Sequence, residues 1–149
     1  MAQFLRRFYT SLLIIFLKHD SVPNSVSSGE RITRFVFSRH HIKNGKVSLE
    51  AFMPQRNTEE TSVYRTNGCS ERKVWLFGDL FVARLRRDRP TLIARGDVPS
   101  EAIFDENLTI VALRTPHPRH AVLRNWPSDK PHQKIKAMAL AQKASLHLR

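Results

Sequence analysis

The sequence predicts an α+β fold: a small mixed or antiparallel sheet packed with two main helices, at about residues 70–87 and 130–148, plus a helix at the N-terminus. The strand-like segments are short and do not alternate regularly with helical ones, as the strands of a parallel α/β sheet would. The two long segments carry apolar residues at helical spacing. The length of 149 residues and the hydrophobic fraction of 41% suit a single domain that buries its own core.

The first thirty residues stand apart by composition. MAQFLRRFYTSLLIIFLKHD combines two early arginines with an apolar run from Leu12 to Leu17, far short of the ~20 residues that a membrane-spanning helix needs. SVPNSVSSGE, which follows, is polar and turn-rich. We expect an amphipathic helix and a linker over residues 1–30, and a single basic domain over residues 31–149. The protein is expected to be cytoplasmic and without a membrane span, and a secretory signal peptide is the alternative interpretation.

Strands are expected in four places within the domain. RITRFVFSR is rich in β-forming residues, and Asn44-Gly45 after it favours a hairpin turn. Residues 91–95 and 107–113 are two further strand candidates, with a helical turn in VPSEAIF between them. Residues 61–66 alternate between two faces, with Ser62, Tyr64 and Thr66 on one and Thr61, Val63 and Arg65 on the other.

The helix at about residues 70–87 has signals at both ends. Ser70 suits the N-cap position, and Pro90 cannot continue the helix. Three arginines fall in its last turn, where the helix dipole favours cations. One buried stripe is expected from the four apolar residues that repeat at helical spacing, Val74, Phe77, Phe81 and Leu85.

The last helix, at about residues 130–148, should begin after Trp126-Pro127. Ser128 or Asp129 is its expected N-cap, and Pro131 suits its first turn. Four side chains spaced by four, seven and four residues should lie within about 60° of one another around its axis, namely His132, Lys136, Lys143 and His147. They predict a basic stripe that either follows phosphates or is a solvated face.

Before this helix lies PHPRHAVLRNWP, which we interpret as a proline-stiffened connector. Its first two prolines restrict the residues before them to extended conformations. The connector would therefore present His117 and His120 at a fixed place on the surface. Trp126 is expected either to anchor the connector to the core or to stack on a base.

Charge is the strongest global signal of function. The chain has 25 Lys and Arg against 13 Asp and Glu, a formal net charge of +12. Such an excess favours nucleic acid, with an acidic protein as the alternative partner. We expect a small protein that binds RNA or DNA without being an enzyme, as part of a larger assembly. If folding joins the two basic segments, its binding residues are Arg84, Arg86, Arg87, Arg89, Arg119, Arg124, Lys134, Lys136 and Lys143.

A metal-independent ribonuclease or phosphoryl-transfer enzyme is the second hypothesis. One histidine would take a proton from a 2′-hydroxyl, another would protonate the leaving oxygen, and arginine would stabilise the phosphorane. The candidate residues are His117, His120, His40 and Arg65. In a purely structural role, Arg65 would pair with Glu60 or Glu59. The third hypothesis is a protein adaptor that uses the N-terminal helix or Trp126 in an interface.

Metal and cofactor signatures are missing from the sequence. The single cysteine, Cys69, permits neither an intrachain disulfide nor a cysteine-based zinc site. No His-Glu-x-x-His, P-loop or dinucleotide-binding motif is present. We therefore expect no metal and no cofactor.

Three segments of the domain carry a resemblance. ETSVYRT, RHAVLRNWP and the alanine-rich KAMALAQKA are similar to a pattern found in small uncharacterised bacterial proteins. The resemblance covers about residues 31–149. It implies a bacterial, cytoplasmic origin, and it assigns no activity and no functional residue.

Overall fold

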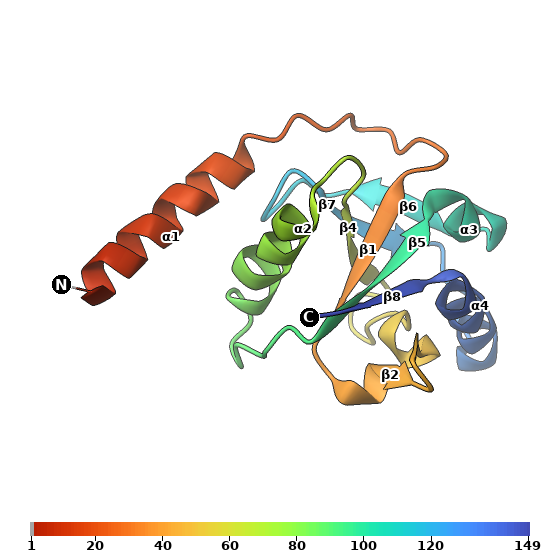
Figure 1. The fold of residues 1–149 in the computed structure, drawn as a ribbon. Helices are drawn as coiled ribbons and strands as arrows, with labels where there is room; N and C mark the ends of the chain where they lie inside the picture. Colours follow the sequence, from red (N-terminus) through yellow and green to blue (C-terminus); the bar gives the residue numbers. More distant parts are fainter. Residues whose placement is uncertain (1) are drawn as a thin grey trace.

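The computed structural model describes residues 2–149 and confirms an α+β architecture (Figure 1). Its centre is a six-stranded antiparallel sheet with the strand order β6-β7-β4-β1-β5-β8. The strands are β1 (Arg31–Val36), β4 (Thr61–Arg65), β5 (Ala94–Pro99), β6 (Thr109–Ala112), β7 (His120–Arg124) and β8 (Ser145–Leu148). The hairpin of β2 (Ile42–Lys43) and β3 (Lys46–Val47) turns at Asn44 and Gly45, both at positive φ, as Asn-Gly predicts.

Helices cover both faces of the sheet, because strand residues alternate between two apolar faces. On one face, Ile32 and Leu123 pack with Leu140 of α4 (Lys130–Lys143) and with α3 (Ser100–Asp105). On the other face, Phe35 and Tyr64 pack with α2 (Glu71–Phe77) and with the π-helical turn Gly78–Ala83 that continues it. The helices α2 and α4 therefore lie on opposite sides of the sheet (Figure 1).

The helix predicted at residues 70–87 begins as expected and ends early. Ser70 caps it by accepting a hydrogen bond from a backbone amide of the first turn. The predicted stripe is buried at Val74, Phe77 and Phe81, but Leu85 is 60% exposed, so its assignment to the core is wrong. The chain winds as a π-helix after Phe77, and the extra residue per turn rotates later side chains away from the core.

The last helix is also shorter than predicted. Asp129 is its N-cap and Pro131 lies in its first turn, as expected, but α4 ends at Lys143. Residues 145–148 form β8 instead, because they pair with the open edge of β5. His147 is thus not on the helix: its Nε2 lies 3.3 Å from the carboxylate of Asp97.

Two strands lie where the sequence suggested something else. β7 occupies the middle of the predicted connector, between β4 and β6, and its Ala121 and Leu123 are buried. Trp126 just beyond it packs against the core, and its indole N–H donates to the carbonyl of Leu123. β5 begins at Ala94, three residues after the predicted start, and it runs on to Pro99. Gly96 and Asp97, which resemble turn residues, belong to the strand because they pair with β1.

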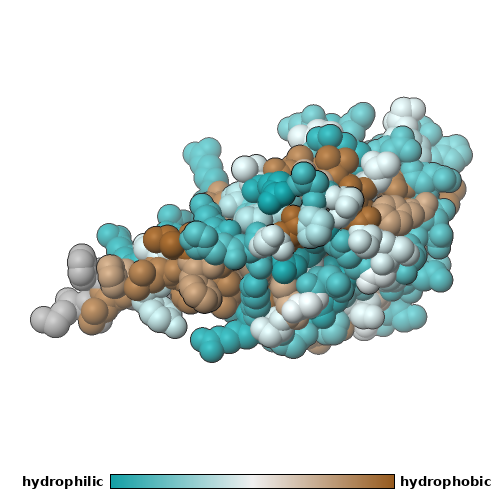
Figure 2. Space-filling view, turned by 90° about the horizontal axis from the view of Figure 1, so that it is seen from above, coloured by the Kyte–Doolittle hydropathy of each residue, from teal (hydrophilic) through white to brown (hydrophobic). Residues whose placement is uncertain are grey.

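The N-terminal helix α1 (Ala2–Lys18) projects away from the sheet, and it packs on the α2 side of the domain through Ile14 and Leu17 (Figure 1). Its outward face carries large apolar side chains that are 50–80% exposed, namely Leu5, Phe8, Tyr9, Leu12, Ile15 and Phe16. Figure 2 shows them as a brown region on the projecting arm. None of the helices in residues 2–149 has the length and apolar character needed to cross a membrane.

The two faces of α1 should differ in their effect on stability. Replacing Phe16, which is 80% exposed, with glutamine is expected to change the free energy of unfolding by less than about 0.5 kcal/mol. The same change at the neighbouring Leu17, which is 7% exposed, should cost about 2–4 kcal/mol because it buries an amide among apolar side chains. Urea denaturation of both variants measures this, and equal losses would show that α1 is docked differently.

Candidate anion-binding pocket

The predicted basic residues are not gathered onto one surface. Arg84, Arg86, Arg87 and Arg89 follow α2, whereas Lys134, Lys136 and Lys143 belong to α4 on the other side of the sheet (Figure 1). Four of the nine already have partners: Arg86 pairs with Asp88, Arg119 with Asp20 and Arg124 with Glu60, and Lys136 donates to the carbonyl of Glu106. The condition for a single binding surface from these nine residues is therefore not met.

His117, a predicted catalytic residue, is fully buried against the rings of Phe77 and Phe81, at 4.6 Å from each centroid. Its Nε2–H donates to the carbonyl of Leu17 at 2.6 Å, and its Nδ1 accepts from the amide of Arg119. Burial lowers the pKa of His117, although its bond to Leu17 opposes this shift. With both ring nitrogens used and no exposure, His117 anchors the end of α1 and cannot meet a substrate.

His40 and Arg65 lie at opposite ends of β1. His40 is exposed in the 3-10 turn Arg39–His41 beyond the carboxyl end of β1, whereas Arg65 pairs with Ile32 near its start. The four predicted catalytic residues therefore do not converge, and a two-histidine mechanism is not built here.

Arg65 has the structural role that was one of the two interpretations, but with another partner. Its guanidinium, 1% exposed, donates to both carboxylate oxygens of Glu30 at 2.8 and 2.9 Å and to the carbonyls of Pro23 and Ser25. Glu60 instead accepts from Arg124 at 2.6 Å. Sequence proximity pointed to Glu60 or Glu59, but the linker folds back over β4 and brings Glu30 closer.

His120 lines a pocket of about 630 Å³ on the α2 side of the sheet. Arg65 lines a different, smaller pocket of about 310 Å³ together with its partner Glu30. The pocket that His120 lines opens where β1 and β4 part, since these strands pair at Ile32 and Thr33 only. Its polar lining consists of Arg34, Gln55, Ser62, Tyr64, Arg86 and His120.

Arg34 bridges the gap between the parting strands. Its Nε donates to the carbonyl of Ala51 at 2.7 Å, and its Nη1 donates to the carbonyl of Ser62 at 2.8 Å. Within residues 2–149, no carboxylate pairs with this guanidinium and its Nη2 has no hydrogen-bond partner. Burial, with the nearby charge of Arg86, lowers the pKa of Arg34 to about 10, so the group remains a cation at neutral pH.

The fully buried arginines have carboxylate partners: Arg65 pairs with Glu30, and Arg95 pairs with Glu71 and Asp97. Arg119, which is partly buried, pairs with Asp20. Arg34 is also partly buried and, like Arg31, donates only to neutral acceptors. A charge taken out of water is stabilised by an opposite charge. Arg34 meets neutral carbonyls and lies near Arg86, which stacks over the ring of Phe37 and pairs with Asp88 at 3.1 Å. The Arg34 guanidinium is therefore the cation at this pocket that has no carboxylate partner among residues 2–149.

Ser62 and His120 form a hydrogen-bonded pair on the pocket wall. The carbonyl of Thr115 can only accept, so Nδ1 of His120 carries the proton in their 2.5 Å bond. The other ring nitrogen, Nε2, is then the acceptor for the Ser62 hydroxyl at 2.9 Å. Burial lowers the pKa of His120, while its bonds to Thr115 and the charge of Glu60 oppose the shift, so the imidazole is neutral at pH 7.

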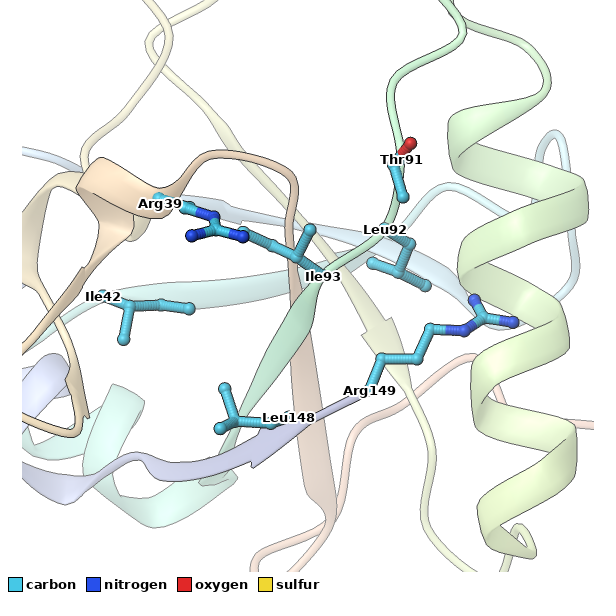
Figure 3. A pocket seen from close by; sticks show the side chains of 7 residues that line it. All are labelled: Arg39, Ile42, Thr91, Leu92, Ile93, Leu148 and Arg149. Atoms are coloured by element: carbon cyan, nitrogen blue, oxygen red, sulfur yellow. The ribbon is translucent and has the colours of Figure 1, made fainter.

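A second pocket, of about 680 Å³, lies between residues 39–42, residues 91–93 and the end of β8 (Figure 3). Its wall is mostly apolar, with Ile42, Leu92, Ile93 and Leu148. Figure 3 shows Arg149 reaching away from these side chains, consistent with its ion pair to Asp79 at 2.5 Å. Arg39 also lines this pocket, but it is exposed to solvent, and the charge of Arg149 is already compensated, so this pocket indicates an anion less strongly than the one at Arg34.

Arg34 and Ser62 were missed at the level of sequence. The available signal was a charged residue inside the apolar run ITRFVF, where a buried cation needs an explanation. Nothing local linked Arg34 to Ser62 or to His120, which join the pocket from three strands. Comparison with protein families, curated proteins and solved structures gives no match, so the geometry of this pocket is what bears on function.

Proposed function

We propose that the protein binds nucleic acid, RNA or DNA, and that the pocket at Arg34 receives a phosphate group of the strand. The observation that carries the proposal is the partly buried Arg34 cation, which lines the pocket and has no carboxylate partner among residues 2–149. A guanidinium is suited to phosphate because its planar fork donates two parallel hydrogen bonds. Arg86, which is paired with Asp88, also lines this pocket, and the Gln55 amide adds a neutral donor.

The basic segment after α2 would continue the binding surface. Arg84, Arg87 and Arg89 are exposed and follow the same turn as Arg86 at the pocket rim. Exposed cations of this kind attract the phosphates that flank the one in the pocket, and they release counterions when they do so. The proposal thus keeps four of the nine basic residues predicted from sequence, and it uses Arg34 in place of the lysines of α4.

Binding to a fluorescent single-stranded RNA and to the DNA of the same sequence tests the proposal. We expect affinity for at least one of them that falls steeply between 50 and 200 mM salt, as neutralised phosphates require. Arg34→Met should weaken binding about tenfold or more, because charge-assisted hydrogen bonds contribute about 1.5–3 kcal/mol.

Arg124→Met is the matched control. It also removes one positive charge, but Arg124 is an exposed residue paired with Glu60, away from the pocket lining. A general effect of net charge would weaken binding equally in both variants, and that result would overturn the proposal. Affinity that is insensitive to salt would overturn it as well.

A further inference from the structure

We propose that Ser62 and His120 form a catalytic pair that cleaves a phosphodiester, with Ser62 as the nucleophile. The inference rests on the proposed function, because the substrate is the strand whose phosphate the pocket binds. It differs from the two-histidine mechanism considered from sequence, since His117 is sealed in the core and His40 lies elsewhere.

The geometry is that of an activated serine. The hydroxyl of Ser62 lies 2.9 Å from Nε2 of His120, within the range of a nucleophile and its base. The Thr115 carbonyl holds the other ring nitrogen, so the tautomer leaves Nε2 free to accept a proton. Both side chains line the pocket, so a phosphate seated there can reach them.

Arg34 lies next to Ser62. Because its Nη1 donates to the carbonyl of Ser62 itself, the guanidinium is tied to the residue that carries the nucleophile. Its unused Nη2 provides positive charge where negative charge would build up on the non-bridging oxygens, and Arg86, which is paired with Asp88, lies beside it. Stabilisation of developing charge by fixed donors is commonly a large part of catalysis.

The reaction proceeds in two balanced steps. In the first, the Ser62 Oγ–P bond forms, the bond from phosphorus to the leaving oxygen breaks, and the serine proton passes through His120 to that oxygen. In the second, water attacks the phosphoserine, its proton passes to His120, the P–Oγ bond breaks and Ser62 regains its proton. The net change is hydrolysis, and no oxidant, reductant or metal takes part.

The pH dependence should follow His120. The pair works with the imidazole neutral, so cleavage is expected to rise with pH and to level off once His120 has lost its proton. The charge of Glu60 acts on His120 and favours the protonated ring, and Arg34, with a pKa of about 10, stays a cation in the range where His120 titrates. The midpoint should lie below the usual histidine value of about 6.5 because burial favours the neutral ring.

A fluorophosphonate probe tests the pair directly in the full chain. It phosphonylates an activated serine: the Oγ–P bond forms, the P–F bond breaks and fluoride leaves, and peptide mass spectrometry locates the adduct. We expect the adduct on Ser62, a loss of at least about 100-fold in labelling rate for His120→Gln, and no change for Ser38→Ala. Ser38 is a matched control because it is also partly buried but accepts from a backbone amide instead of bonding an imidazole.

Hydrolysis of bis(p-nitrophenyl) phosphate gives the second readout, and Ser62→Ala should abolish it while oligonucleotide binding persists. Binding without Ser62 labelling and without hydrolysis would overturn the catalytic pair and leave the proposed function standing. Labelling of Ser62 in a protein that binds neither RNA nor DNA would overturn the proposed function and leave an activated serine with another substrate. Labelling at other serines only would also overturn the pair.

Discussion

Arg65→Met is expected to lower the free energy of unfolding by about 3–5 kcal/mol, as breaking a buried ion pair does when one partner is left behind. The substitution leaves Glu30, which is 9% exposed, without the cation that accounts for two of its hydrogen bonds. It also removes the donor to the carbonyls of Pro23 and Ser25, so the linker loses its attachment to β4.

Chemical denaturation at pH 7 measures the loss, and Arg65→Met/Glu30→Gln is the informative second variant. Neutralising Glu30 should recover part of the stability because no unpaired charge remains. If the double variant is as unstable as the single one, the penalty comes from packing and not from charge.

The same pair has a pH signature. The hydrogen bonds from Arg65 lower the pKa of Glu30, against the opposing effect of burial. A carboxyl whose folded pKa is depressed contributes stability that is fully present above its unfolded value of 4.5 and is lost as the pH falls through the folded value. The gap in stability between the native chain and Arg65→Met should therefore shrink below about pH 4.5.

Arg95→Met should have an effect of similar size, about 3–5 kcal/mol. Arg95 is 0% exposed, lies over the ring of Trp75 at 4.8 Å, and connects the buried Asp97 to Glu71 on α2. Its removal leaves Asp97 in the interior with only Thr33 and His147 as polar side-chain neighbours. It also cuts the link between β5 and the first turn of α2.

Two comparisons make the Arg95 result specific. Arg124→Met removes an exposed arginine from an ion pair with Glu60, and it should cost no more than about 1 kcal/mol. Arg34→Met should cost about 1–2 kcal/mol, because it leaves two carbonyls without donors but strands no carboxylate. If Arg34→Met is as destabilising as Arg95→Met, then Arg34 is a structural residue and the pocket loses its main support.

The same contrast separates folding from function. Replacing a residue that holds the fold together should lower the free energy of unfolding. Replacing a cation whose partner is a ligand should weaken ligand binding and change the free energy of unfolding little. Arg34→Met is therefore the single variant for which stability and binding should diverge most.

Several elements could be predicted from sequence because their signals are local. Asn44-Gly45 turns the β2–β3 hairpin, Ser70 and Asp129 cap their helices, and alternation in residues 61–65 places Val63 and Tyr64 on opposite faces of β4. Each of these depends on the conformations that a few consecutive residues prefer. The buried stripe of α2 was correct only as far as the helix kept its regular turn.

The elements that were missed depend on partners far along the chain. β8 looked like the end of a helix, and it is a strand because β5 offers an unpaired edge. β7 was hidden by the prolines that flank it, although β4 and β6 pair with it on both sides. Such pairings outweigh local preference, so no pattern within the segment indicates them.

The amino-acid sequence alone determined the α+β class, the positions of most turns and helix starts, and the excess of positive charge. Tertiary structure alone decided where that charge is neutralised. It brings Glu30, Asp20 and Glu71 to Arg65, Arg119 and Arg95, and it brings none of them to Arg34. The strength of an ion pair depends on distance and burial, and both are set by chain folding. A count of charges therefore cannot show which cation has no carboxylate partner.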